Sequence, residues 1–301
     1  MTLLIGSIQL GFIYGLLALG IYISFRILNI PDLTADGSFT LGLSVSAAMA
    51  VSGHPFPGIL AAIIAGAAAG SVTGLLQTKL GIHPILAGIL TMSGLYSINL
   101  YILGSRSNLS LIGNETVFSL VQGALPMMDK EQIKTLIPLV CCIAVTGFLI
   151  YFFKTHLGLC IRATGNNEDM VRTSSINVDA MKITAMCISN ACVAFAGAVL
   201  AQYQGYADIS SGIGILVVGL ASAIIGEAVV GRRSVALGLV SAVLGSLIYR
   251  FIVAAALTSN IFPAYTLRIV SAVIVVIALS IPAVKNRIQL NAMRKRAQRD
   301  A

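Results

Sequence analysis

Long apolar runs are the feature of this chain that most limits its fold. A helix that crosses a hydrocarbon core of ~30 Å needs about 20 apolar residues, and nine runs approach that length. They are Thr2–Phe25, Gly37–Val51, Pro57–Leu76, Pro84–Leu103, Leu136–Phe153, Ile183–Tyr203, Ile213–Val230, Val235–Leu257 and Thr266–Ile281. Only 10% of the residues are charged, against about 25% in soluble domains. We predict an all-α polytopic transmembrane bundle of about eight to ten spans.

The chain divides into one membrane domain, residues 1–284, and a basic tail, residues 285–301. A polar loop at 154–182 interrupts the membrane domain. The five cysteines lie within or beside the predicted spans, without the spacing of metal ligands, and we interpret them as packing residues. His54, His83 and His156 also lack acidic or cysteine companions in ligand spacing, so we expect no metal site.

The positions of the 19 Lys and Arg residues predict an orientation. If the spans alternate in direction, 14 of these residues fall on one side of the membrane and 3 on the other. The 14 are Arg26, Lys79, Lys154, Arg162, Arg172, Lys182, Arg232, Arg233, Lys285, Arg287, Arg294, Lys295, Arg296 and Arg299, and the 3 are Arg106, Lys130 and Lys134. Since positive loops stay in the cytoplasm, we predict a multi-pass cell-membrane protein with the C-terminus and the 154–182 loop inside.

The same argument places the N-terminus outside if there are nine spans, and one re-entrant segment would reverse that placement. The net charge of +8 is thus explained by membrane orientation. No basic helix or aromatic-interleaved patch of the kind that tracks phosphates is present, so we expect no nucleic-acid partner.

Two polar segments, Asn29–Ser38 and Tyr203–Gly214, each precede a short span. Non-helical backbone at membrane depth must be buried in protein or line a water-filled cavity. An offset of 176 residues aligns the two segments. The identical pairs are Asp32 and Asp208, Ser46 and Ser222, and Ala47 and Ala223. Paired interruptions on opposite sides of a membrane indicate an inverted repeat with a transport path between its halves; two unrelated loops are the alternative.

Polar residues near these segments are candidates to line a translocation path, because polar side chains in spans tend to face the bundle interior. The candidates are Asp36, Ser38, Thr40, Asn99 and Ser211. Helix capping is an alternative role for Asp32, Asp36 and Asp208. Glu227 lies near the cytoplasmic end of an apolar span, where a carboxylate needs a partner. We predict an ion pair with Arg232 or Arg233, or a role in gating.

The 154–182 loop contains signals for two short helices. Gly165 can end the first, and Asn166 or Asn167 can cap a second that begins at Glu168 and runs to about Ser174. So short and polar a helix is not stable alone, which favours docking into a partner over a solvated connector. The chain has no Gly-x-x-x-x-Gly-Lys-[Ser/Thr] phosphate loop and no nucleophile elbow, so we predict a non-catalytic subunit.

The loop sequence LGLCIRATGNNEDMVRTSSINVDAMK resembles the cytoplasmic loop of ABC importer permeases of the branched-chain amino acid and ribose type. The segments NIPDLTADGSFTLG, HPILAGILTMSGLYSINLYILG and DISSGIGILVVGLASAIIGEAVVG are similar more narrowly to tryptophan/tyrosine ABC transporter permeases. In this family the loop forms a coupling helix on the ATPase. The residues that match it are Ala163, Thr164, Gly165, Asn166, Asn167, Glu168, Asp169, Met170, Val171, Arg172, Thr173 and Ser174.

The resemblance implies a type II-like ABC importer permease with broken helices, working as a homodimer. Its expected partners are cytoplasmic ABC ATPase subunits, which hold ATP and Mg, and an extracytoplasmic substrate-binding protein. The expected substrate is a small molecule such as an amino acid, with an aromatic one favoured. A secondary transporter driven by an ion gradient is the alternative, although such proteins place ionisable residues near the middle of their spans. An integral membrane enzyme is a third option, and it lacks a catalytic constellation.

Overall fold

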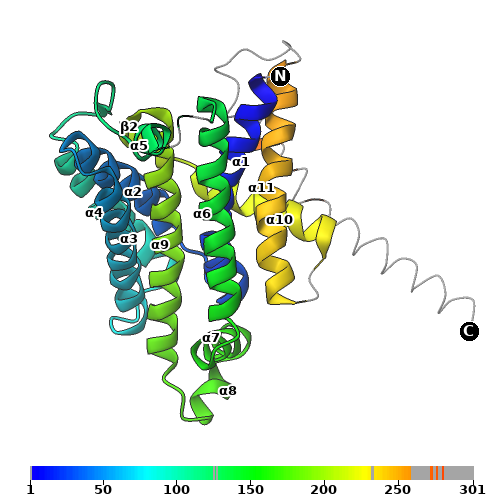
Figure 1. Cartoon of the computed structure of the whole chain (residues 1–301). Helices are drawn as coiled ribbons and strands as arrows, with labels where there is room; N and C mark the ends of the chain where they lie inside the picture. Colours follow the sequence, from blue (N-terminus) through cyan, green and yellow to red (C-terminus); the bar gives the residue numbers. More distant parts are fainter. Residues whose placement is uncertain are drawn as a thin grey trace, which may run out of the picture.

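The computed structural model describes residues 2–124, 126, 128–231, 234–258, 272, 273, 276 and 280, which form a bundle of long helices (Figure 1). Its helices are α1 (Thr2–Tyr22), the π-helix η1 (Ile23–Ile27), α2 (Thr34–Val51), α3 (Pro55–Thr78), α4 (Pro84–Ile102), α5 (Val117–Ala124), α6 (Lys130–Phe152), α7 (His156–Asn166), α8 (Glu168–Thr173), α9 (Val178–Gln204), the 3-10 helix η2 (Ile209–Gly212), α10 (Ile215–Val230) and α11 (Val235–Thr258). Two short strands, β1 (Asn108–Ser110) and β2 (Tyr206–Asp208), pair antiparallel with Asn108 opposite Asp208.

Among the described residues, seven helices are long and apolar enough to cross a membrane. They are Leu4–Ile27, Pro55–Thr78, Pro84–Ile102, Lys130–Phe152, Val178–Gln204, Ile209–Val230 and Val235–Ala256. The predicted polytopic helical bundle is thereby confirmed. The ninth predicted span, Thr266–Ile281, falls almost wholly outside the described residues, as does the 285–301 tail.

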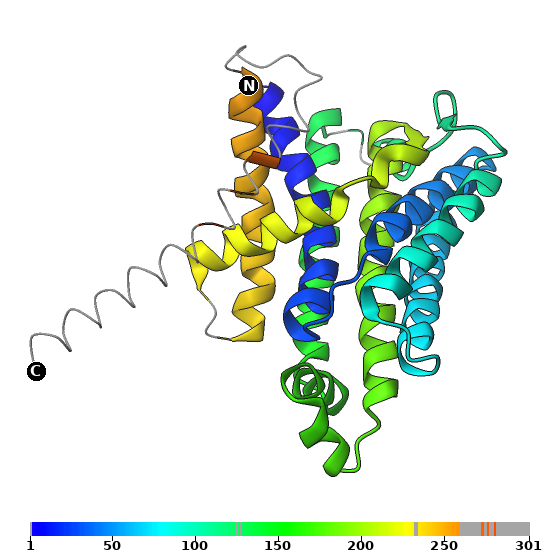
Figure 2. The ribbon, with the colours of Figure 1, turned by 180° about the vertical axis from the view of Figure 1, so that it is seen from behind.

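Helix α2 corresponds to the second predicted span, but it differs from the seven spanning helices. It lies inside the bundle, packed against α3, α4 and α9 (Figure 2), and most of its residues are buried. Serines at positions 38, 44 and 46 are fully buried in it. Protein rather than lipid solvates this helix, which explains how it can be less apolar than its neighbours.

Small residues bring the central helices close together. A Cβ atom at Gly66 or Gly70 of α3 would overlap backbone atoms of α9, and one at Gly74 would lie 2.9 Å from the Cα of Ile183. Likewise, Gly11 of α1 lies against Leu247 of α11. Glycines at intervals of four allow such close approach of helices. These glycines therefore serve the packing of the bundle.

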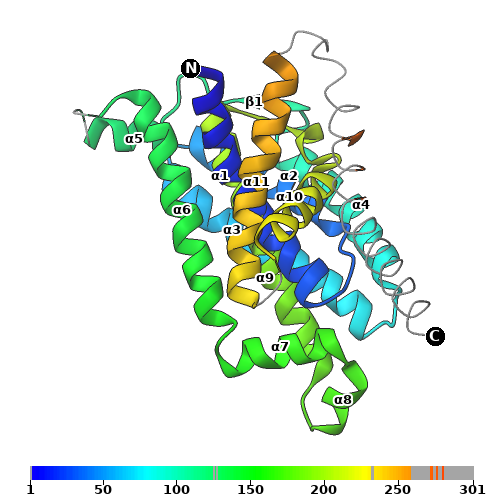
Figure 3. The ribbon, with the colours of Figure 1, turned by 90° about the vertical axis from the view of Figure 1, so that its right-hand side faces the viewer.

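The two ends of the bundle carry different elements. Helices α7 and α8 lie at one end, whereas α5, β2 and the start of α1 lie at the other (Figures 1 and 3). Helix α1 runs toward the α7–α8 end and α9 runs away from it (Figure 1). A break follows each of these helices: Leu28–Leu33 after η1, and Tyr206–Gly214 after α9. The two breaks thus follow helices of opposite direction, as an inverted repeat requires.

Candidate functional site

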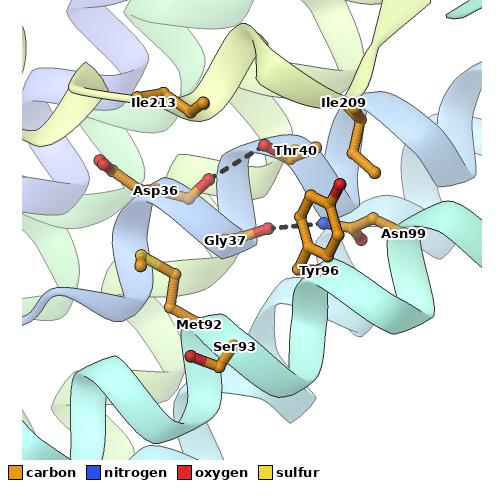
Figure 4. A pocket seen from close by; sticks show the side chains of 10 residues that line it. Asp36, Gly37, Thr40, Met92, Ser93, Tyr96, Asn99, Ile209 and Ile213 are labelled. Carbon is orange, nitrogen blue, oxygen red and sulfur yellow. Dashed lines mark hydrogen bonds between the residues drawn. The ribbon is translucent and has the colours of Figure 1, made fainter. Parts of the chain in front are cut away.

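A pocket of about 390 Å³ opens between α2, α4 and η2 (Figure 4). Its lining residues are Asp36, Gly37, Thr40, Met92, Ser93, Tyr96, Asn99, Ile209, Gly212 and Ile213. The pocket combines apolar side chains with a few hydroxyl and amide groups, the composition typical of small-molecule sites. It is partly open to the surroundings, because Tyr96 and Ile213 are 56% and 67% exposed.

Asp36 connects α2 to the second break. One carboxylate oxygen accepts a hydrogen bond from the Gly214 N–H and the other from the Leu216 N–H, both at 2.9 Å. These amides stand at the start of α10, where N–H groups lack intrahelical partners and a negative charge is favoured. The predicted capping role is therefore present, but Asp36 caps α10 rather than its own helix.

Three of the five predicted path residues meet at this pocket: Asp36, Thr40 and Asn99. The Asn99 Nδ2 donates to the Gly37 carbonyl at 3.3 Å, which attaches α4 to α2 (Figure 4). Ser38 is instead fully buried on another side of α2. Ser211 adjoins the lining residue Gly212 and is not itself part of the lining.

Sequence reasoning did not identify the other α4 residues of the pocket. Met92, Tyr96 and Asn99 are spaced by four and three residues and so share one helix face. This periodicity, extended from Asn99, was the available signal. The apolar contributions of Ile209 and Ile213 had no comparable signal, because their position depends on how η2 folds over α2.

The first break is organised by a buried carboxylate. Asp32, 2% exposed, accepts hydrogen bonds from the Thr34 N–H at 2.9 Å and from the Asn190 Nδ2 at 2.7 Å. It thereby fixes the start of α2 and ties the break to α9. In the second break Asp208 accepts from the Ser210 N–H at 2.7 Å, the same local contact at the aligned position.

Helices α7 and α8 have the predicted form. Asn167 separates them, and its side-chain oxygen accepts the Met170 N–H at 3.1 Å to cap α8, which begins at Glu168 as expected. Asp169 is exposed and Met170 is 68% exposed. Lys182 pairs with Glu168 at 2.6 Å and thus fastens α8 to α9. The tip of this segment presents an acidic and an apolar side chain to its surroundings.

Helix α7 also contacts the first break directly. The Asn29 Nδ2 donates to the Gly165 carbonyl at 2.8 Å. Gly165 packs so closely on this segment that a Cβ there would overlap the Ile27 carbonyl oxygen and lie 2.9 Å from the Leu28 Cα. Asn29 adopts a positive φ of 56° to make this turn, a conformation that Asn tolerates better than most residues. The predicted coupling segment and the first break form one contiguous structure.

Glu227 has a partner that sequence analysis did not name. Its carboxylate lies 2.6 Å from the Arg26 guanidinium, which belongs to η1. The Glu227 side chain is 5% exposed and that of Arg26 is 22% exposed. This ion pair joins the far end of α10 to the segment just before the first break. Arg232 and Arg233 lie outside the described residues, so their predicted pairing stays a prediction.

Among the described residues, no group of three or more His, Cys, Asp or Glu side chains could hold a metal ion. Cys142, Cys160 and Cys192 are buried, and Cys141 and Cys187 are half-buried. All five are free thiols among helices, which agrees with the predicted packing role.

Comparison with known proteins decides the family. Residues 3–279 match the sequence model of a protein family, the permease components of branched-chain amino acid transport systems. The chain belongs to this family. It is therefore a membrane permease of an ABC transport system, as the loop and break sequences predicted.

Curated relatives agree with this assignment. A tyrosine transport system permease protein of Clostridioides difficile is 34% identical over 270 residues, covering 89% of this chain and 87% of its own length. An uncharacterized protein of Rickettsia prowazekii is 36% identical, covering 75% and 78%. The D-allose transport system permease protein of Escherichia coli is 26% identical, covering 70% and 63%. No solved structure matches the chain.

Proposed function

We propose that this permease is the membrane subunit of an ATP-driven importer and that a cytoplasmic ATPase docks on α7 and α8. The observation that carries the proposal is the contact between Gly165 of α7 and the Ile27–Asn29 segment. A partner that displaces α7 would move the first break with it. The chain itself supplies the path and the linkage, while ATP and Mg belong to the partner.

A contiguous set of contacts supports this linkage. From Gly165 it passes to the first break, where Asp32 binds Asn190 of α9. Helix α2 begins at the same break and reaches α10 through Asp36. Closely packed helices move as units between discrete arrangements. Displacement of α7 would accordingly reach the pocket between α2, α4 and η2, which we propose is part of the translocation path.

Two further expectations belong to this proposal. The open side of the pocket, with the exposed Tyr96 and Ile213, suits coverage by a second copy of the chain in a homodimer. An extracytoplasmic binding protein would deliver the substrate to that side. The C-terminus and the α7–α8 end are then cytoplasmic, in keeping with the positive-inside rule.

For the substrate we propose an aromatic amino acid. The relative named for tyrosine transport aligns over most of both chains, and the sugar relative is less similar. Met92, Tyr96 and Ile213 offer the apolar and aromatic surfaces that an aromatic ring packs against. Uptake of labelled tyrosine into proteoliposomes should be reduced by excess tryptophan or phenylalanine and not by allose.

Charge reversal at the tip of α8 tests the docking surface. Asp169→Lys changes an exposed residue that forms no ion pair in the described structure, whereas reversing Glu168 would also break its bridge to Lys182. We expect Asp169→Lys to weaken ATPase binding roughly tenfold, about 1.4 kcal/mol, because the reversed charge no longer complements the partner's surface. The measurement is the affinity of the purified ATPase for the permease in nanodiscs. Arg106→Glu, an equal change at the opposite end, should leave it unaltered, and unchanged affinity with Asp169→Lys would contradict the docking site.

A further inference from the structure

Helix α5 lies at the end of the bundle opposite α7 and α8 (Figures 1 and 3). Residues of α5, α6 and α9 line a second pocket there. It has a volume of about 330 Å³, and most of its lining residues have polar side chains, including Lys130, Lys134, Ser119 and Gln122. Lys130 and Lys134 are one helical turn apart and so share a face of α6. Neither forms a salt bridge with a carboxylate in the described part of the chain.

The acidic neighbours of these lysines face elsewhere. Glu131 lies on the next face of α6, where its carboxylate accepts a hydrogen bond from the Gln9 Nε2 of α1 at 3.2 Å. Asp129 takes part in the capping box at the start of α6. The Lys134 ammonium lies 5.7 Å from the centre of the Tyr203 ring, a cation–π contact that holds it over the pocket. Among the described residues, neither ammonium therefore forms a salt bridge, although the Glu131 carboxylate is close enough to act on the Tyr203 phenol.

An apolar groove of about 430 Å³ adjoins the polar pocket along the same three helices, with α3 as its fourth wall. Phe118 of α5 lines both. Every other lining side chain of the groove is apolar, among them Val121, Ile137, Val140 and Val199. Val140 is 54% exposed and Leu60, across the groove, is 63% exposed. In a membrane-spanning bundle, such residues face the hydrocarbon of the bilayer.

The polar pocket lies near the membrane surface, and the apolar groove lies deeper in the membrane. Lys130 and Gln204 are the terminal residues of two spanning helices, so the polar pocket lies at the level of the headgroups. Val140 follows Lys134 by six residues of helix, which places it about 9 Å deeper. Helix α5 separates the levels, with Ser119 and Gln122 toward the polar pocket and Val117 and Val121 toward the groove.

We propose that the two cavities together bind one anionic phospholipid from the leaflet opposite the α7–α8 end. Lys130 and Lys134 bind the phosphate, Ser119 and Gln122 contact the rest of the headgroup, and an acyl chain lies in the groove below Phe118. Cations above an apolar cleft match both parts of such a lipid, since basic pockets between spanning helices favour anionic headgroups. A bound lipid would fasten α5 to α6 and α9.

Lipid binding by the full-length permease in detergent tests this proposal, with native mass spectrometry and thermal unfolding as readouts. We expect dioleoyl phosphatidylglycerol to bind and raise the Tm. Dioleoyl phosphatidylcholine has the same chains, and glycerol 3-phosphate has an anionic headgroup without chains; neither should raise it. Equal stabilisation by phosphatidylcholine, or stabilisation by glycerol 3-phosphate, would overturn the lipid site. No effect of phosphatidylglycerol would also overturn it and would favour an acidic protein partner for the lysines.

Variants separate the two halves of the site. Each lysine near a headgroup contributes about a factor of five to affinity, so K130Q/K134Q should weaken phosphatidylglycerol binding roughly twenty-five-fold. Arg106→Gln, which removes a cation of the same end outside both cavities, should have no effect. Val140→Trp should obstruct the groove and reduce binding with both lysines in place. Unaltered affinity in K130Q/K134Q would refute the proposal, and the comparison of lipids on the unmodified chain decides it if that variant does not fold.

Discussion

The two breaks in the bundle share a local contact and differ in their surroundings. At the aligned positions Asp32 and Asp208, a carboxylate accepts the N–H of the residue two positions later. Asp32, however, is buried and bonded to Asn190 of α9, whereas Asp208 sits in a two-stranded ribbon beside Asn108. Only the first break contacts α7. Similar turns thus occur in one break that contacts α7 and in one that borders the pocket.

The difference also concerns what each break can do. The first is hydrogen-bonded to Gly165 of α7 and to Asn190 of α9, so its displacement must move packed helices. The second contains η2, and its Ile209, Gly212 and Ile213 line the pocket. Asp36 is the direct connection between them, because it belongs to α2 and binds the start of α10. We infer that a displacement of α7 reaches the first break, and that the second break controls access to the pocket.

Replacing the aligned aspartates Asp32 and Asp208 by alanine should show the largest difference between the breaks, measured as a loss in the free energy of unfolding. Asp32→Ala leaves the Thr34 N–H and one N–H of the Asn190 amide buried without an acceptor, while the Asn190 Nδ2 keeps its bond to the Met186 carbonyl. Each group left without an acceptor costs about 1–3 kcal/mol. We expect a loss of about 2–5 kcal/mol in the free energy of unfolding. Asp208→Ala should cost about 1 kcal/mol, the usual value for a lost cap. Denaturation of the two variants in the same detergent checks this, and equal losses would mean that the environments do not differ.

Loss of the Asp36 contact should disconnect the breaks. Asp36→Ala removes the acceptor of two N–H groups, and hydrogen bonds to charged groups contribute about 1.5–3 kcal/mol. If one state of the transport cycle depends on them, uptake should fall about ten- to a hundredfold. Asp36→Asn, which retains one acceptor, should be intermediate. Proteoliposome uptake measures the effect, and normal uptake by a folded Asp36→Ala protein would exclude this role.

The Arg26–Glu227 pair should contribute a smaller and separable amount. A double-mutant cycle with Arg26→Gln and Glu227→Gln should give a coupling energy of about 1–2 kcal/mol for this largely buried pair. The exposed Lys79–Asp179 pair, at 3.4 Å, serves as the comparison. Its coupling should be about 0.5 kcal/mol or less. Equal coupling energies in the two cycles would show that η1 and α10 are not specifically joined.

Much of this architecture could be predicted from the sequence because its determinants are local. Apolar runs gave the helices, and Asn167 identified the start of α8 because a cap acts on N–H groups two or three residues away. Glycines at intervals of four on α3 are likewise a local signal for close helix contact. These signals require only the order of residues along the chain.

Contacts between residues that are far apart in the sequence could not be predicted in the same way. Glu227 was assigned to cations within six residues, whereas Arg26 is 201 residues away in sequence. Asp36 was expected to cap its own helix or to line a path, yet the amides that it binds are 178 and 180 residues away. Which distant group meets a carboxylate depends on helix packing, and no local pattern encodes it.

The central claim, that motion enters through α7 and the first break, is tested most directly by Gly165→Ala. The added Cβ would overlap the Ile27 carbonyl oxygen and so push α7 from the break, while the exposed tip of α8 is untouched. Gly147→Ala on α6, where a Cβ meets nothing within 4 Å, is the matched control. In proteoliposomes with the ATPase and the binding protein, we predict that Gly165→Ala retains ATPase binding and loses ATP-driven uptake, whereas Gly147→Ala retains both. Full uptake by Gly165→Ala would contradict the account.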